Sequence, residues 1–426
     1  MREMKNSGIA WIGAIPRDWH LSKIGSLYTQ RNEKVSDKDY QPLSVTMQGV
    51  LPQLATAAKT DDGDNRKLVR VGDFAINSRS DRRGSCGISP LDGSVSLISI
   101  ILTPRTAMHP GYYNWLFHTT LFADEFYKWG HGIVADLWTT RWQEMKSISV
   151  PVPEYAEQER IAAFLDAECA EIDAVLEKTR ASIEEYKKLK QAVITQAVTK
   201  GIRGDRPMKD SRIEWIGEIP ESWEVSSVRY IGQLQNGISK GGEFFGKGFP
   251  FVSYGDVYKN YELPHSVSGL IDTTEDERAT YSVEYGDIFF TRTSETIEEV
   301  GFSCVCKRSI PNATFAGFII RLRPFCADEK ILTDYAKYYF RGEHIRAYLV
   351  KEMNLVTRAS LGQTLLKGMS VIVPPKSVQK EIAEYLDDKC ADIDALVAKK
   401  QQYLTEIENY KKSLIYEYVT GKKEVI

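Results

Sequence analysis

The sequence is poor in the residues that build metal centres and disulfide frameworks. It contains six cysteines and six histidines in 426 residues. Cys304 and Cys306 stand close together but have no second pair at zinc-ligand spacing, and the histidines form no cluster. These spacings argue against a metal site and predict unpaired thiols.

Charge of one sign and long apolar runs are missing as well. The formal net charge is −3, so bulk electrostatics gives no argument for a nucleic-acid partner. No segment is long and apolar enough to span a bilayer, and the N-terminal MREMKNSGIA is too polar for a signal peptide. We therefore expect a cytoplasmic protein with no membrane partner.

Signatures of catalysis are also missing. There is no glycine-rich motif for a dinucleotide or a methyl donor. The run GGEFFGKG places Gly241, Gly246 and Lys247 at P-loop spacing, but Gly248 stands where a magnesium-binding hydroxyl is needed. The sequence therefore predicts a binding protein that is not an enzyme and holds no cofactor in this chain.

What the sequence does contain is one unit written twice. MKNSGIAWIGAIPRDW, which starts at Met4, recurs as MKDSRIEWIGEIPESW from Met208. QERIAAFLDAECAEIDAVLEK, from Gln158, recurs as QKEIAEYLDDKCADIDALVAK from Gln379. Repeats of this length are duplicated domains, not solenoid units.

Each copy begins with the WIGxIP element, continues through short β-rich runs and a late helical stretch, and ends in one long helix. This order predicts an α+β protein with two tandem α/β domains. The expected boundaries are 1–153 for the first domain, 154–203 for its helix, 204–375 for a linker and the second domain, and 376–426 for the second helix.

Both long helices carry a narrow apolar seam with two positions per heptad. The seam comprises Leu165, Ile172, Leu176, Ile183 and Val193, then Leu386, Ile393, Val397, Leu404 and Leu414. Each helix could lie on its own domain, but so narrow a stripe favours pairing of the two helices as a coiled coil. Lys190 and Lys411 interrupt both seams at one equivalent position. We interpret them as solvated ends of the seam, with a role in register as the alternative.

The linker decides the direction of pairing. From Gly201 to Trp215 there are too few residues to run back along a helix of about 45 residues, roughly 65 to 70 Å long. The helices are therefore predicted to pair antiparallel, with pseudo-two-fold symmetry. Cys169 and Cys390 are then expected at opposite ends of the pair, without a disulfide.

One polar, basic loop in each domain follows a Gly-Asp turn and a short strand. The candidate DNA-binding residues are Asn77, Ser78, Arg79, Ser80, Arg82 and Arg83 in the first loop, Thr291, Arg292, Thr293 and Ser294 in the second, and Lys240 and Arg358 beside other polar runs. Arginine can grip guanine with two hydrogen bonds, asparagine pairs with adenine, and hydroxyls contact bases or phosphates. Composition alone fits solvated loops equally well, but the duplication suits two half-sites on a duplex.

The chain resembles the specificity (S) subunits of Type I restriction-modification systems. The resemblance rests on the MKDSRIEWIGEIPESWEV element and its first copy, on the helix entries PVPEYAEQERIAAFLD and PPKSVQKEIAEYLD, and on the endings AVTKG and YVTGK. It implies two target-recognition domains that read a split sequence in double-stranded DNA. It also implies two methyltransferase (M) subunits, which carry S-adenosylmethionine, and nuclease-translocase (R) subunits. ATP and magnesium are likewise expected in the partner subunits.

The recognition domains are the variable part of that family, so individual base contacts do not transfer. If the two helices separate the half-sites, their length acts as a ruler for the gap in the DNA. The alternative is a non-catalytic coiled-coil scaffold whose two domains bind other proteins.

Overall fold

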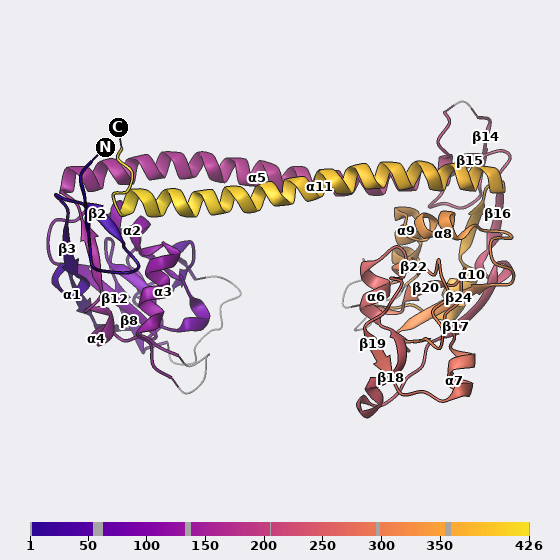
Figure 1. Cartoon of the computed structure of the whole chain (residues 1–426), viewed down its shortest axis with the longest axis horizontal. Helices are drawn as coiled ribbons and strands as arrows, with labels where there is room; N and C mark the ends of the chain where they lie inside the picture. The colour runs from indigo at the N-terminus through magenta and orange to yellow at the C-terminus, as the bar shows by residue number, and fades with distance from the viewer. Residues whose placement is uncertain are drawn as a thin grey trace. The chain divides into compact units, whose positions relative to one another are not determined.

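The computed structural model describes residues 2–53, 63–132, 138–204, 206–294, 299–353 and 359–425. The chain divides into two compact units, the first made of Met1–Arg180 and Gln401–Ile426 and the second of Ala181–Lys400. Each of two long helices, α5 (Tyr155–Lys200) and α11 (Lys376–Val419), contributes residues to both units (Figure 1).

The first unit is built on a four-stranded antiparallel sheet with the strand order β10-β9-β12-β4. A smaller sheet has the order β11-β8-β5, and short pairs join β1 to β2, β3 to β13 and β6 to β7. The elements before α5 are β1 (Met4–Asn6), β2 (Ala14–Pro16), β3 (His20–Lys23), α1 (Ile24–Leu27), β4 (Tyr28–Arg31), β5 (Lys34–Val35), β6 (Leu43–Thr46), β7 (Gly49–Pro52), β8 (Arg66–Val69), β9 (Phe74–Asn77), η1 (Ser80–Arg82), β10 (Cys86–Ile88), β11 (Gly93–Val95), β12 (Ser99–Pro104), α2 (Pro110–Phe117), α3 (Thr120–Lys128), α4 (Trp142–Met145) and β13 (Ser149–Val152).

Both faces of this sheet are covered, which explains why every residue of β9 is buried. Side chains alternate between the two faces of a strand. Phe74 and Ile76 therefore pack with the aromatic residues of α2 and α3, and the rings of Phe74 and Phe117 lie 4.4 Å apart between centroids. Ala75 and Ile101 face the other way, into a small core shared with the second sheet and the β6-β7 hairpin.

The second unit repeats this arrangement. Its four-stranded sheet has the order β22-β20-β24-β17, which matches the first unit strand for strand. The elements between the long helices are β14 (Met208–Asp210), β15 (Glu218–Pro220), β16 (Glu224–Ser227), η3 (Val228–Tyr230), β17 (Gly232–Asn236), η4 (Gly242–Phe244), β18 (Phe245–Val252), α6 (Tyr254–Lys259), β19 (Gly269–Ile271), α7 (Glu275–Thr280), β20 (Ile288–Thr291), β21 (Thr293–Ser294), β22 (Ser303–Val305), β23 (Thr314–Phe315), β24 (Ile319–Pro324), α8 (Thr333–Tyr339), α9 (Glu343–Glu352), β25 (Ala359–Ser360), α10 (Gln363–Gly368) and β26 (Ser370–Val373).

The strands of this sheet also divide their side chains between two cores. Ile288 and Phe290 pack in one core with α8, α9 and parts of both long helices. Phe289 and Ile319 face a separate core formed with β18 and β23. The predicted α+β class with two tandem α/β domains is therefore confirmed, because one sheet topology occurs in both units.

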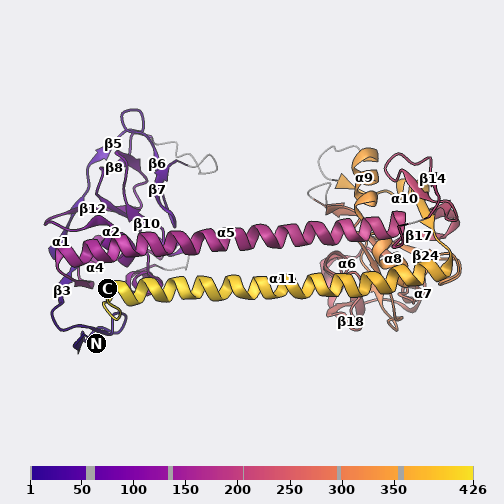
Figure 2. The same ribbon diagram turned by 90° about the horizontal axis from the view of Figure 1, so that it is seen from above.

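The long helices run antiparallel inside each unit (Figure 2). In the first unit, Asp173 accepts a hydrogen bond from Lys411 at 2.6 Å, and Arg180 further along α5 binds Glu408, which comes earlier in α11. In the second unit, the ammonium of Lys400 lies over the ring of Tyr186, while Lys190 binds Asp394. The predicted antiparallel pairing is confirmed in both units.

Every residue predicted for the seam is buried or half-buried. The buried ones are Leu165, Leu176, Ile183, Leu386, Ile393, Leu404 and Leu414, and the half-buried ones are Ile172, Val193 and Val397. The interpretation of Lys190 and Lys411 as solvated ends is wrong. Each forms an ion pair at 2.6 Å with an aspartate of the other helix, Asp394 or Asp173, and the lysine side chains are only 16% and 22% exposed. These reciprocal pairs favour the alternative role, because polar groups beside a seam can specify its register.

Two further features concern the cysteines and the apolar character of the helices. The six cysteines are unpaired, and all but Cys326 are buried. None of the helices in the described ranges has the length and apolar character needed to cross a bilayer.

His344 in α9 gives the second unit a predicted sensitivity to acid. Burial, with a smaller contribution from Arg346, lowers the pKa of His344 to about 3. Neither ring nitrogen has a hydrogen-bond partner among the described residues. An unfolded histidine binds a proton near pH 6.5, so stability is full above about pH 6.5 and is lost as the pH falls towards 3.

We therefore expect His344→Phe to reduce the loss of stability between pH 7 and pH 5, measured by urea unfolding at both values. His265→Phe, at an exposed position, is the control and should keep the wild-type difference. An unchanged pH dependence in His344→Phe would contradict the assignment.

Candidate nucleic-acid interface

The first loop, residues 77–84, begins where β9 ends and holds itself in place with its first two polar residues. Asn77 and Ser78 are buried. The Asn77 side-chain oxygen accepts from the Arg79 backbone N–H at 3.1 Å, and the Ser78 hydroxyl donates to the Ile98 carbonyl. In this structure both side chains form hydrogen bonds within the protein, so they stabilise the backbone at the base of the loop.

The basic residues of this loop differ in how they are held. Arg83 forms an ion pair with Asp124 of α3, whereas Arg82 is exposed and lies 3.7 Å from Asp81. The Arg79 side chain is half-buried, and its guanidinium has no hydrogen-bond or ion-pair partner in the described part of the chain. Ser80 is tied down through its backbone N–H, which donates to the Trp138 carbonyl at 3.0 Å. Arg79 and Arg82 are thus the loop's most available cationic groups.

The second loop begins at the topologically equivalent strand end, after β20. Thr291 is fully buried and closes the base of the loop, because its hydroxyl accepts from the Phe302 N–H and its own N–H donates to the Phe302 carbonyl, both at 2.9 Å. Thr293 and Ser294 form β21, which pairs with β25, and the Ser294 hydroxyl lies 3.3 Å from Glu299. These three hydroxyl residues are also engaged within the fold.

Arg292 stands between these anchored residues. Its backbone N–H donates to the Phe318 carbonyl at 2.8 Å and its carbonyl accepts from Leu361 at 2.7 Å. Its half-buried guanidinium has no hydrogen-bond or ion-pair partner among the described residues. The backbone is therefore fixed while the charged group is available for a ligand.

The two other predicted residues are not part of this arrangement. The Lys240 ammonium binds Glu277 at 2.6 Å and lies 4.9 Å from the centre of the Phe244 ring, so its charge is compensated inside the unit. Arg358 lies outside the described residues. The DNA-binding role of all twelve predicted residues stays a prediction.

Phe318 is a neighbour that the sequence interpretation missed. Its ring is 63% exposed and its carbonyl binds the backbone of Arg292. In the sequence it is one apolar residue in the run ATFAGFIIRL, where no local pattern separates an exposed ring from a buried one. An exposed aromatic ring can contact bases by stacking or apolar contact.

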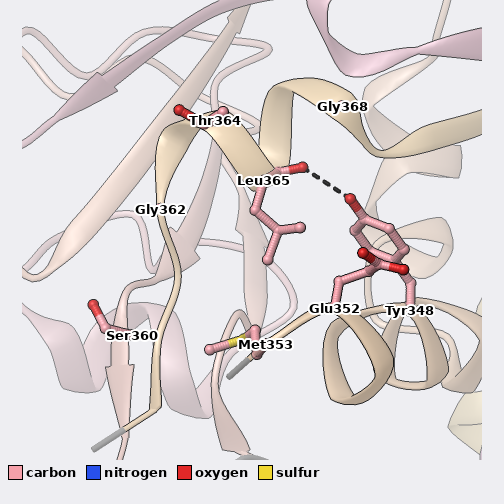
Figure 3. A pocket seen from close by; sticks show the side chains of 8 residues that line it. All are labelled: Tyr348, Glu352, Met353, Ser360, Gly362, Thr364, Leu365 and Gly368. Carbon is pink, nitrogen blue, oxygen red and sulfur yellow. Dashed lines mark hydrogen bonds between the residues drawn. The ribbon is translucent and has the colours of Figure 1, made fainter. Parts of the chain in front are cut away.

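One hollow in the second unit is a candidate ligand site. A hollow of about 520 Å³ beside α9 and α10 is lined by Tyr348, Glu352, Met353, Ser360, Gly362, Thr364, Leu365 and Gly368 (Figure 3). The Tyr348 hydroxyl donates to the Leu365 carbonyl at 3.0 Å, and the one charged side chain in the lining is the carboxylate of Glu352. Such a lining repels phosphate. In the ranges that the structure describes, no three His, Cys, Asp or Glu residues gather as a possible metal site.

Comparisons with known proteins relate this duplicated fold to one class of protein, the specificity subunits of Type I restriction enzymes. Residues 220–408 match the family described as Type I restriction modification DNA specificity domain. The Type I restriction enzyme EcoKI specificity subunit of Escherichia coli strain K12 is 22% identical over 436 residues, covering 96% of this chain and 90% of that protein.

Solved structures share the fold. A chain from work on complex assembly and conformational transition of the type I R-M system matches with a TM-score of 0.73 at 14% identity, over 96% of this chain and 99% of that one. The HsdS subunit from Thermoanaerobacter tengcongensis matches with a TM-score of 0.51 at 16% identity, over 96% and 98% of the two chains. The resemblance predicted from the sequence is confirmed: the chain shares the fold of these solved chains, and residues 220–408 match the specificity-domain family.

Proposed function

We infer that this protein is the DNA-specificity subunit of a Type I restriction-modification complex. One observation carries the inference: a single recognition fold occurs twice, and in each copy an arginine-bearing loop leaves the end of the equivalent strand, β9 or β20. Two such domains suit a bipartite target in double-stranded DNA, with one domain for each half-site. In this role the chain selects the sequence and leaves the chemistry to its partners.

The partners we propose are two M subunits and the R subunits of the complete complex. S-adenosylmethionine would belong to the M subunits, and ATP with magnesium to the R subunits. This division suits a chain that combines DNA-facing loops with a protein-facing helix pair.

The long helices offer a surface for such partners. Leu396, Tyr403 and Tyr410 of α11 are exposed and follow one another at intervals of seven residues. Val175 and Leu189 of α5 occupy equivalent positions in the repeat and are also exposed. Exposed apolar residues at heptad spacing on a helix, outside its buried seam, suit contact with a further helix from another subunit. We propose that M subunits dock on such residues.

Co-expression with a cognate M subunit tests the function. Sequencing of the modified adenines in such cells is expected to reveal methylation at one discrete sequence with two specific parts and a gap of fixed length. Assembly without sequence-specific methylation would favour the alternative, a non-catalytic coiled-coil scaffold. Absence of assembly would overturn the proposal.

The loop arginines are expected to act on separate half-sites. Arg79→Ala or Arg82→Ala should weaken recognition of one half-site, and Arg292→Ala that of the other, by about 1 to 3 kcal/mol for each lost guanine contact. The measurement is the methylation rate on the mapped duplex and on duplexes with single base changes in each half. The half-site read by the unaltered domain is the internal control. A variant that loses discrimination in both halves would point to damage to the fold.

A further inference from the structure

Two arginines lie beneath the end of the second recognition loop. Arg341, in the turn between α8 and α9, donates from Nε to the Ser303 carbonyl at 2.7 Å and from Nη2 to the carbonyls of Val257, Tyr258 and Asn260 at 2.8 to 3.0 Å. Arg346, in α9, donates to the Val300 carbonyl and, at 2.9 Å, to the Gly301 carbonyl. Both guanidiniums also lie 5.1 to 5.2 Å from the centre of the Phe302 ring.

Both arginine side chains are half-buried, and backbone carbonyls are their main hydrogen-bond partners. Neither arginine forms an ion pair with a carboxylate in the described part of the chain, and burial lowers the pKa of Arg346 to about 10. Withdrawing a cation partly from water without an anionic partner costs free energy, and an apolar side chain of similar volume would pack without that penalty. We therefore attribute the presence of arginine at these two positions to the hydrogen bonds that it donates to backbone carbonyls.

Three of these carbonyls, those of Val300, Gly301 and Ser303, belong to the segment that leaves the recognition loop. The other three belong to the end of α6 and to the residue that follows it. Gly301 and Phe302 are bonded to Thr291, the last residue before Arg292. By holding residues 300–303, Arg341 and Arg346 thus hold the base from which Arg292 projects. Gly301 also sits tightly against α9, since a Cβ at this position would lie 2.7 Å from Leu349 and 3.4 Å from Arg346.

In the first domain a tyrosine, not an arginine, contacts the backbone of the recognition loop. Its second helix after the sheet is α3, and the Tyr127 hydroxyl of α3 lies 3.0 Å from the Asn77 carbonyl and 3.3 Å from the Arg82 carbonyl. These two carbonyls flank Arg79. In both domains, then, the second helix after the sheet holds the backbone of the loop through a side-chain donor.

We propose that Arg341 and Arg346 in the second domain, and Tyr127 in the first, are positioning residues that set the recognition loops for base readout. The proposal rests on the proposed function and goes beyond it, because these residues need not touch DNA. Arg341 and Arg346 would fix the direction in which the Arg292 side chain projects from its loop. Tyr127 would do the same for Arg79 and Arg82. Small displacements of a binding group sharply weaken its interactions.

The test uses the full chain assembled with its M subunits and duplexes built on the mapped methylation sequence. Arg346→Met is expected to reduce discrimination against base changes in one half-site by about tenfold or more, while discrimination in the other half stays at the wild-type level. Tyr127→Phe removes one hydroxyl and should give a smaller loss, about two- to tenfold, in the opposite half-site. Arg346→Lys, which keeps the charge but cannot hold two carbonyls in a fixed fork, should not restore discrimination.

Two controls on α9 separate positioning from stability. Ile345→Ala empties a buried apolar site without removing a bond to the loop, so it should lower the unfolding midpoint and preserve discrimination well below that midpoint. Lys351→Met breaks an exposed ion pair with Glu214. It should change neither the unfolding midpoint nor the discrimination between bases. Equal loss of discrimination in Arg346→Met and Ile345→Ala, or full recovery in Arg346→Lys, would overturn the proposal. Failure of the wild-type complex to methylate a discrete sequence would instead overturn the proposed function.

Discussion

Replacing Trp223 with alanine is expected to lower the free energy of unfolding of the second unit by about 3 to 5 kcal/mol. Trp223 is fully buried in a core that includes Ile194 and Val198 of α5. Its ring also packs against Gly201, where a Cβ would lie 3.3 Å from the indole. The substitution therefore opens a large cavity at the end of α5, where the WIGxIP element meets the helix.

Urea unfolding followed by circular dichroism measures this effect. Trp129→Ala is the control, because Trp129 is exposed, its indole N–H binds Glu125, and the Lys128 ammonium lies over its ring. That control is expected to change stability by about 0.5 kcal/mol or less. A loss below about 1 kcal/mol in Trp223→Ala would mean that the site collapses around the smaller side chain, and that the indole is not the anchor of this end of the helix.

A heptad inserted into both long helices is expected to change the DNA target itself. Seven residues added at Ala181 in α5 and at the repeat-equivalent Gln402 in α11 keep the seam in register. They lengthen each helix by about 10.5 Å at 1.5 Å per residue, which corresponds to about three base pairs at 3.4 Å each. Assembled with M subunits, the variant should direct methylation to a sequence with both original half-sites and a gap longer by about three base pairs.

The same variant should lose the original target, because only one half-site could be engaged at a time. Each lost base contact costs about 1 to 3 kcal/mol, so the combined loss is expected to be among the largest for any change in the chain. Sequencing of modified adenines gives the result directly. A five-residue insertion, which shifts the seam out of register, is the control and should impair helix pairing. Methylation with an unchanged gap in the heptad variant would remove the ruler from the mechanism and leave the seam a role in assembly only.

Periodicity and repetition in the sequence were sufficient to predict the architecture. The seam from Leu165 to Val193, with its second copy, specifies two helices that need a partner, and the short linker after Gly201 leaves antiparallel pairing as the direction. The seam spacing and the linker length are properties of the sequence, and tertiary contacts do not change them. The repeated WIGxIP and helix-entry motifs likewise carried the resemblance to Type I specificity subunits.

The role of each polar side chain could not be predicted in this way. Lys190 and Lys411 break the seam in the sequence, but in the structure each pairs with an aspartate of the facing helix. Lys240 resembles a DNA-binding lysine by composition, yet Glu277 compensates its charge. Such partners lie far away in the chain, so no local pattern identifies them.

The sequence by itself determined that the chain is a duplicated α+β unit with a paired long helix, because hydrophobic spacing and repeats are written residue by residue. Only the tertiary structure decided which polar side chains of the two loops are already hydrogen-bonded within the fold and which are available to a ligand. It buries Asn77, Ser78 and Thr291 as parts of the loop bases, and it leaves Arg79 and Arg292 without a partner among the described residues. It also placed Arg341 and Arg346 under the second loop. The physical reason is that hydrogen-bond satisfaction depends on which distant backbone groups come within about 3 Å, and folding alone brings those groups together.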